Sequence, residues 1–147
     1  AQSSYSVRIR TEDSGGETYE KQVIISVADV AESPGDLALS SNKVAENRSA
    51  GAAVGELSAS DPDSGETFTY SLVSGEKGTD NGSFLIDGTT LKTTQKFDYE
   101  AQSSYSIRVE ATDSTNNTHE EALTVLVTDL NEPPTDITLT KNSSLFR

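Results

Sequence analysis

Residues 101–110 read AQSSYSIRVE, and the apolar side chains in this stretch fall at every second position. Successive side chains of a β-strand point to opposite faces, so Tyr105, Ile107 and Val109 would share one face of a strand. The same alternation follows in Leu123, Val125 and Val127. The polar segment between the two runs, DSTNN at 113–117, predicts a turn. The sequence therefore predicts a β-hairpin with one buried face.

The hairpin sequence occurs a second time, at the start of the chain. Residues 1–6 read AQSSYS, as do residues 101–106, and the offset of 100 residues continues without a gap. Further identical pairs at this offset include Asp13 and Asp113, Thr18 and Thr118, Glu20 and Glu120, Val27 and Val127, Asp29 and Asp129, and Glu32 and Glu132. A shared register of this length indicates tandem copies of one unit.

The repeat sets the expected domain organisation. A unit of about 100 residues can bury a core without disulfides, so we expect one complete copy in the 147 residues. Residues 1–34 are predicted to be the C-terminal strands and linker of a preceding repeat, and 35–132 the complete repeat. Residues 133–147 are predicted to be the linker and first strand of a following repeat.

Further short strands are expected within the complete repeat, at 37–40, 53–60, 67–73 and 83–94, separated by segments rich in Gly, Asp, Asn and Ser. No window shows the apolar period of an amphipathic helix. This pattern predicts an all-β fold, a Greek-key immunoglobulin-like sandwich of about seven strands. It also argues against disorder, which high charge and few aromatic residues would otherwise suggest.

The charge balance excludes some classes of partner. The chain has 24 acidic and 11 basic residues, which gives a formal net charge of -13. Such a surface repels nucleic acid phosphates and anionic lipids and attracts cations. We therefore expect no nucleic acid partner. In addition, no cysteine is present, so neither disulfides nor thiolate metal sites can form.

Catalytic machinery is also sparse. His119 is the only histidine and lies in a polar turn region, so His-dependent triads and zinc sites lack their other members. A glycosidase with paired carboxylates is the main alternative, and it needs two carboxyls that face each other across a cleft. The acidic pairs here are expected at the solvated ends of a sandwich, and no Trp is present to form a sugar platform. We predict that the protein is not an enzyme.

The acidic residues concentrate at the expected strand ends and connections. The clusters are Glu46-Asn47, Asp61-Pro62-Asp63, Asp98-Tyr99-Glu100, Asp113, and Asp129-Leu130-Asn131-Glu132. Calcium prefers about six to eight oxygen ligands from carboxylates, amides and carbonyls. In an extended chain, residues i and i+2 point the same way and can bracket one ion. The clusters therefore predict Ca²⁺ binding, and the absence of expected flanking helices argues against an EF-hand.

The ordered set of these motifs resembles a cadherin repeat. VAEN at 44–47, DPD at 61–63, FDYE at 97–100, ATD at 111–113 and DLNEPP at 129–134 follow the order and approximate spacing of that family. The resemblance covers the whole complete copy. It looks closest to the cadherin-like tandem repeats of large bacterial surface or secreted proteins.

The resemblance implies that calcium ions lie at the junctions between successive repeats and stiffen the array. The ligands to the following junction would be Glu46, Asp98, Glu100, Asp129, Asn131 and Glu132, with the carbonyl oxygen of Leu130. The ligands to the preceding junction would be Asp61, Asp63 and Asp113, with Asp29 and Glu32 from the preceding linker. Ala31 stands where Asn131 stands in the next copy, so the preceding junction lacks one side-chain oxygen.

The resemblance also implies an extracellular, cell-surface or secreted protein. We expect calcium-dependent cell adhesion or protein–protein association through a calcium-rigidified array, with neighbouring repeats of the same chain and homophilic self-association as contacts. The alternatives are a non-adhesive structural spacer in a large surface protein and a polysaccharide-binding module. The absence of Trp argues against the strand exchange of vertebrate classical cadherins.

Overall fold

The structure is a computed structural model that describes residues 3–134. It divides into two compact units, residues 1–32 and 33–147, which are described separately below. Residues 135–147 lie outside the described residues, and the strand predicted for the following repeat falls among them. No helix in the described part is long and apolar enough to cross a membrane.

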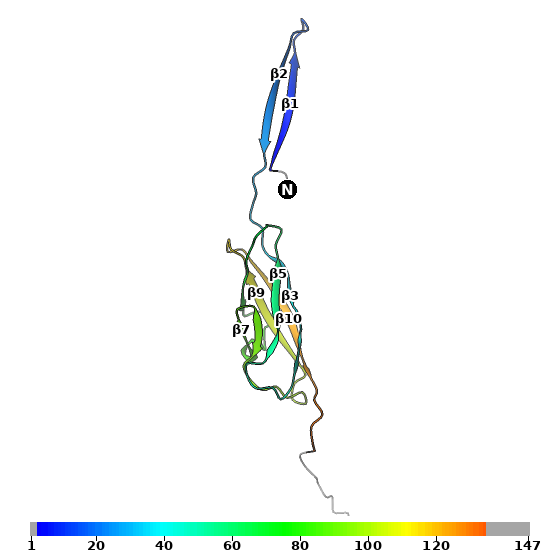
Figure 1. Ribbon diagram of the computed structural model, residues 1–147, viewed down its shortest axis with the longest axis vertical. Helices are drawn as coiled ribbons and strands as arrows, with labels where there is room; N and C mark the ends of the chain where they lie inside the picture. Colours follow the sequence, from blue (N-terminus) through cyan, green and yellow to red (C-terminus); the bar gives the residue numbers. More distant parts are fainter. Residues whose placement is uncertain (1–2, 135–147) are drawn as a thin grey trace, which may run out of the picture. The chain divides into compact units, whose positions relative to one another are not determined.

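The first unit is a single antiparallel hairpin, formed by β1 (Ser4–Glu12) and β2 (Thr18–Ser26) (Figure 1). The Asp13 side chain closes its turn, because Oδ1 accepts the backbone N–H groups of Gly15 and Glu17 at 2.8 and 2.9 Å. Asp113 makes the equivalent turn in the second unit, where its Oδ1 accepts the N–H groups of Thr115 and Asn117, both at 2.8 Å. The repeat predicted from the sequence is thus visible in the turn geometry.

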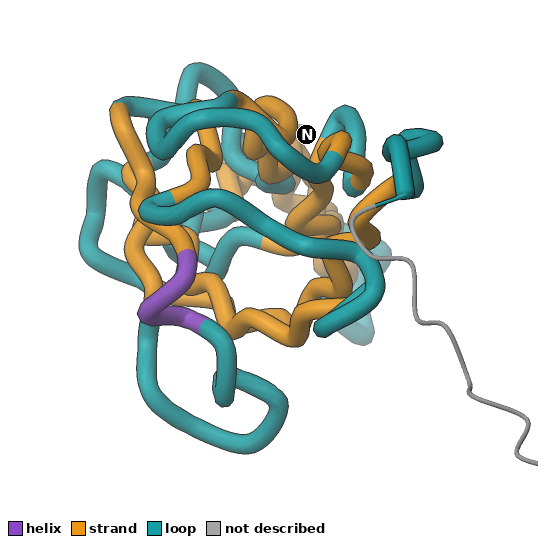
Figure 2. Tube along the Cα trace, turned by 90° about the horizontal axis from the view of Figure 1, so that it is seen from below, coloured by secondary structure: helices purple, strands orange, loops and turns teal. Residues whose placement is uncertain are grey.

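The second unit is a sandwich of two four-stranded sheets, which confirms the predicted all-β fold. One sheet has the order β4-β10-β9-β6, and its strands are β4 (Lys43–Ala45), β10 (Thr118–Thr128), β9 (Ser104–Thr112) and β6 (Thr69–Leu72). The other has the order β3-β5-β8-β7, with β3 (Gly35–Leu39), β5 (Ala53–Ser60), β8 (Thr90–Thr93) and β7 (Phe84–Asp87). A single 3-10 turn, η1 (Asn81–Ser83), precedes β7 and is the purple segment in Figure 2.

The hairpin β9–β10 supplies much of the core, as its alternation predicts. The inward side chains of Ile107, Val109 and Val125 are fully buried, and Tyr105 is 6% exposed. Tyr5, which occupies the same register position in the first unit, is 50% exposed. The two hairpins share their pairing, since Tyr5 faces Ile25 and Tyr105 faces Val125. The apolar face is therefore the same in both copies, and it is covered in the complete one.

One strand prediction was wrong in detail, and one strand was missed. The single strand expected at 83–94 is two strands, β7 and β8, because the chain turns between them at Gly88, which has a φ of 64°. Residues 43–45 were not predicted as a strand, yet they pair in parallel with the end of β10. A run of three residues shows too little alternation to be recognised, and its conformation depends on the neighbouring strand.

A close backbone approach makes Gly55 a sensitive position in β5. A Cβ atom there would lie 2.4 Å from the carbonyl oxygen of Ser41 and 2.8 Å from its amide nitrogen. We expect Gly55→Ala to lower the free energy of unfolding by about 1–3 kcal/mol, because backbone must move to admit the methyl group. Urea denaturation measures the loss. Gly82→Ala is the control, since nothing lies within 4 Å of a Cβ at Gly82; equal midpoints for both variants would contradict the prediction.

Candidate metal centre

The best-defined acidic residue is Glu46, which follows β4 and has 0% of its surface exposed. Its Oε2 accepts the backbone N–H of Tyr99 at 2.9 Å, and its Oε1 accepts the backbone N–H of Leu130 at 2.7 Å. The residue is therefore tied to two segments distant in sequence. A buried carboxylate is costly unless hydrogen bonds or a cation compensate it, and here the two amides supply part of that compensation.

Two further carboxylates lie beside Glu46. One carboxylate oxygen from each of Glu46, Asp98 and Glu100 lies within 4.8 Å of the others, and Asp98 and Glu100 are exposed. We call these three residues the carboxylate cluster. No other group of three potential ligand side chains comes this close within residues 3–134. In the same part of the chain no Lys or Arg forms a salt bridge with any of the three.

The negative charge around the cluster affects the pKa of Glu100. A backbone hydrogen bond lowers the pKa of Glu100, but burial and the charges of Glu46, Glu132 and Asp129 outweigh it, so the pKa lies above its usual value. Charged groups that repel one another disfavour the ionised form. Glu100 thus has a hydrogen bond, but among the described residues no nearby positive charge offsets the repulsion from the neighbouring carboxylates.

The linker after β10 contributes to the same end of the sandwich. Leu130 donates its N–H to Glu46, and Glu132 Oε1 accepts a hydrogen bond from Asn47 Nδ2. Asp129, Leu130, Asn131 and Glu132 are exposed. The structure thus brings the linker against Glu46 and Asn47. The contact between Asn47 and Glu132 was not predicted from the sequence.

The upstream set is less compact. Asp61 Oδ1 accepts the N–H of Asp63 at 2.8 Å, whereas Asp61 Oδ2 is buried and has no hydrogen-bond partner in the described structure. Asp113 is 6% exposed, and burial raises its pKa. Hydrogen bonds from Asn117 and Thr115 outweigh this effect, so the pKa of Asp113 lies below its usual value. Asp61, Asp63 and Asp113 do not form a group within 4.8 Å.

A glutamate that sequence reasoning missed links the two upstream loops. Glu66 Oε2 accepts hydrogen bonds from the backbone N–H of Ser114, at 3.1 Å, and from the Ser114 hydroxyl. The loop that carries Asp61 is thereby joined to the turn that carries Asp113. Its sequence signal is weak, because Glu66 lies in a polar loop with many similar residues.

Asp29 and Glu32 belong to the first unit, in the segment after β2, and both are exposed. Their assignment to a junction with Asp61, Asp63 and Asp113 remains a prediction.

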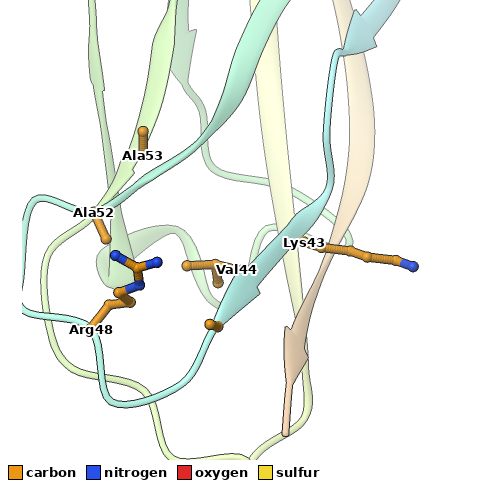
Figure 3. Close-up of a pocket in the computed structure, with 6 residues that line it drawn as sticks. Lys43, Val44, Arg48, Ala52 and Ala53 are labelled. Atoms are coloured by element: carbon orange, nitrogen blue, oxygen red, sulfur yellow. The ribbon is translucent and has the colours of Figure 1, made fainter. Parts of the chain in front are cut away.

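A surface pocket of about 370 Å³ on the second unit is lined by Lys43, Val44, Ala45, Arg48, Ala52 and Ala53. Figure 3 shows the Arg48 side chain extending between Val44 and Ala52, while Lys43 points away. The lining contains no acid, histidine or hydroxyl group. It therefore offers no oxygen ligands from side chains.

Comparison with known proteins identifies the family. The sequence pattern of the family described as "Cadherin domain" matches residues 40–128, which is more than half of the chain. The chain belongs to the cadherin domain family. Domains of this family are cell-adhesion modules rather than enzymes.

Among curated proteins, human Protocadherin Fat 4 is 30% identical over 145 residues. The match covers 91% of this cadherin chain and 3% of that protein. This chain thus spans a small fraction of the curated relative it matches.

Two solved structures with the same fold are also of protocadherins. Extracellular cadherin domains 1–4 of Protocadherin Gamma B7 are 26% identical, with a TM-score of 0.64, and the match covers 88% of this chain and 33% of that one. Extracellular cadherin domains 3–6 of Protocadherin Gamma B2 are 27% identical, with a TM-score of 0.60, and the match covers 87% and 33% of the two chains. The chain is therefore homologous to protocadherin extracellular repeats.

Two sequence-based expectations find no support in these comparisons. The expected closeness to bacterial surface proteins is not supported, because the relatives named here are protocadherins and the curated one is human. A polysaccharide partner is likewise unsupported, since none of these names refers to one.

Proposed function

We propose that this cadherin chain is part of an extracellular adhesive array whose complete repeat, residues 35–132, binds Ca²⁺ at both ends. The observation that carries the proposal is the carboxylate cluster, in which three carboxylates converge without a basic partner. Only oxygen ligands are offered, which suits calcium rather than softer metals. Family membership adds that such repeats serve adhesion.

The downstream set would comprise the carboxylate cluster with Asp129, Asn131, Glu132 and the carbonyl oxygen of Leu130. Bound calcium would supply the positive charge that offsets repulsion among these carboxylates. Glu46 is held by the amides of Tyr99 and Leu130, so the sandwich edge and the linker are joined before any ion binds. If calcium binds only the folded form, it stabilises the folded form by mass action.

The upstream set would comprise Asp61, Asp63 and Asp113, with Asp29 and Glu32 of the preceding linker. Support comes from Asp61 Oδ2, a buried carboxylate oxygen without a hydrogen-bond partner among the described residues. Such an oxygen is costly unless a cation or a water molecule compensates it. A calcium ligand role would explain its position.

Thermal melting of Glu100→Gln tests the downstream site. The pKa of Glu100 lies above its usual value, so ionisation of this carboxyl destabilises the folded protein relative to the unfolded chain once the pH exceeds the usual pKa. We expect Glu100→Gln to raise the melting temperature in chelator and to reduce the further rise that calcium causes in the wild-type chain. Glu76→Gln, at an exposed loop position, is the control. If Glu100→Gln and the control both gain the full calcium-induced rise, the site assignment is wrong.

Sedimentation with calcium and with chelator tests the adhesive part of the proposal. Calcium-dependent self-association would support homophilic contact between repeats. Calcium binding that stabilises a strictly monomeric chain would instead favour the spacer function.

A further inference from the structure

Asn47 lies at the centre of the downstream end and is not itself assigned as a ligand. Its φ is 62°, in the left-handed region, where asparagine is tolerated better than most residues. Its backbone N–H donates to the carbonyl oxygen of Phe97 at 3.0 Å, immediately before Asp98. The main chain of Asn47 therefore contacts the turn that carries Asp98 and Glu100.

The side chain of Asn47 reaches a different ligand-bearing segment. Its Nδ2 donates to Glu132 Oε1 in the linker, 85 residues away in sequence. Leu130 is the linker's other attachment at this point, through its N–H to Glu46. Asn47 and Glu46 are adjacent, and together they hold the linker at both Leu130 and Glu132.

We propose that Asn47 is a positioning residue that holds Glu132 beside the carboxylate cluster in the calcium-free protein. This inference rests on the proposed function, because it assigns Asn47 a role toward the downstream calcium site. The Asn47 amide donates to a carboxylate, and hydrogen bonds to charged acceptors are stronger than neutral ones. With Glu132 pre-placed, calcium binding requires less ordering of the linker.

A simpler explanation is that asparagine is present only because the backbone is left-handed. Asn47→Gly separates the two roles, since glycine keeps the positive φ and removes the amide. Asn116→Gly is the matched control: Asn116 has a φ of 69° at the tip of the β9–β10 turn, and no hydrogen bond of its side chain is found in the described structure. Glycine also occupies the equivalent position in the first copy, at Gly16 with a φ of 86°.

The first measurement is the ¹⁵N heteronuclear NOE of residues 129–132 in chelator, which reports linker order without any metal. We expect Asn47→Gly to lower these NOE values and Asn116→Gly to leave them unchanged. Asn47→Asp is expected to act like Asn47→Gly, because its carboxylate would repel Glu132. Unchanged linker order in both Asn47 variants would overturn the inference.

The second measurement is calcium affinity by calorimetry. Loss of one charge-assisted hydrogen bond should weaken binding by about tenfold in Asn47→Gly, with no change in Asn116→Gly. Loss of linker order with wild-type calcium affinity would also overturn the positioning role. Absence of calcium binding by the wild-type chain would refute the proposed function, whereas the NOE comparison would still test the contact.

Discussion

Replacement of Glu46 by alanine is expected to remove calcium binding in the accessible range and to destabilise the calcium-free protein. The variant loses a buried carboxylate of the cluster, and calcium affinity follows the number of charged ligands, so a loss on the order of 100-fold is expected. It also leaves the N–H groups of Tyr99 and Leu130 without their acceptor. Both hydrogen bonds are partly buried, and an unpaired donor costs at most about 1–3 kcal/mol, which urea denaturation in chelator can measure.

Glu46→Gln separates the two effects. Glutamine keeps the length of the side chain and one carbonyl oxygen, but it lacks the charge. We expect it to weaken calcium binding as strongly as alanine while costing less stability in chelator. Wild-type calcium affinity in Glu46→Gln would show that this carboxylate is structural and not a ligand.

Replacement of Phe97 by alanine is expected to give the largest loss of folding stability. Phe97 is 2% exposed and packs against two other rings, with centroids 4.3 Å from Tyr105 and 5.5 Å from Phe84. Truncation of a buried phenylalanine costs about 3–5 kcal/mol through lost transfer energy and the remaining cavity. That is a large share of the roughly 5–15 kcal/mol by which a domain is stable.

Equilibrium urea unfolding in chelator measures the effect of Phe97→Ala without a contribution from calcium. Leu85→Ala is the control, because Leu85 is 40% exposed on β7 and surface substitutions usually change stability by less than about 0.5 kcal/mol. Similar losses in the two variants would mean that the ring cluster does not form the core.

The hairpin, the repeat and the sandwich class were predictable because they rest on period-two alternation and direct sequence identity. Ile107 and Val125 are buried as their alternation predicts. The short strand at 43–45 was not predictable, since its conformation is set by pairing with β10 across some eighty residues of sequence. The turn at Gly88 was predictable but was missed, since Asp87-Gly88 between two short strand-like runs is a common hairpin signal.

The candidate site was predictable as a set of acidic residues but not as a geometry. The resemblance named Glu46, Asp98 and Glu100 together, and the structure brings them within one small cluster. The burial of Glu46 could not be read from the sequence, because a glutamate is usually exposed. Nor could the amide of Asn47 be assigned to Glu132, since that contact depends on where the linker lies.

Calcium binding at the carboxylate cluster is tested most directly by a calorimetric titration of the wild-type chain and Glu46→Gln side by side. The prediction is saturable binding by the wild-type chain, with a Kd of about 1 mM or tighter, as is typical of extracellular calcium modules, and a loss of that binding in Glu46→Gln. Identical isotherms for the two proteins, or no saturable heat from the wild-type chain up to about 10 mM calcium, would contradict it.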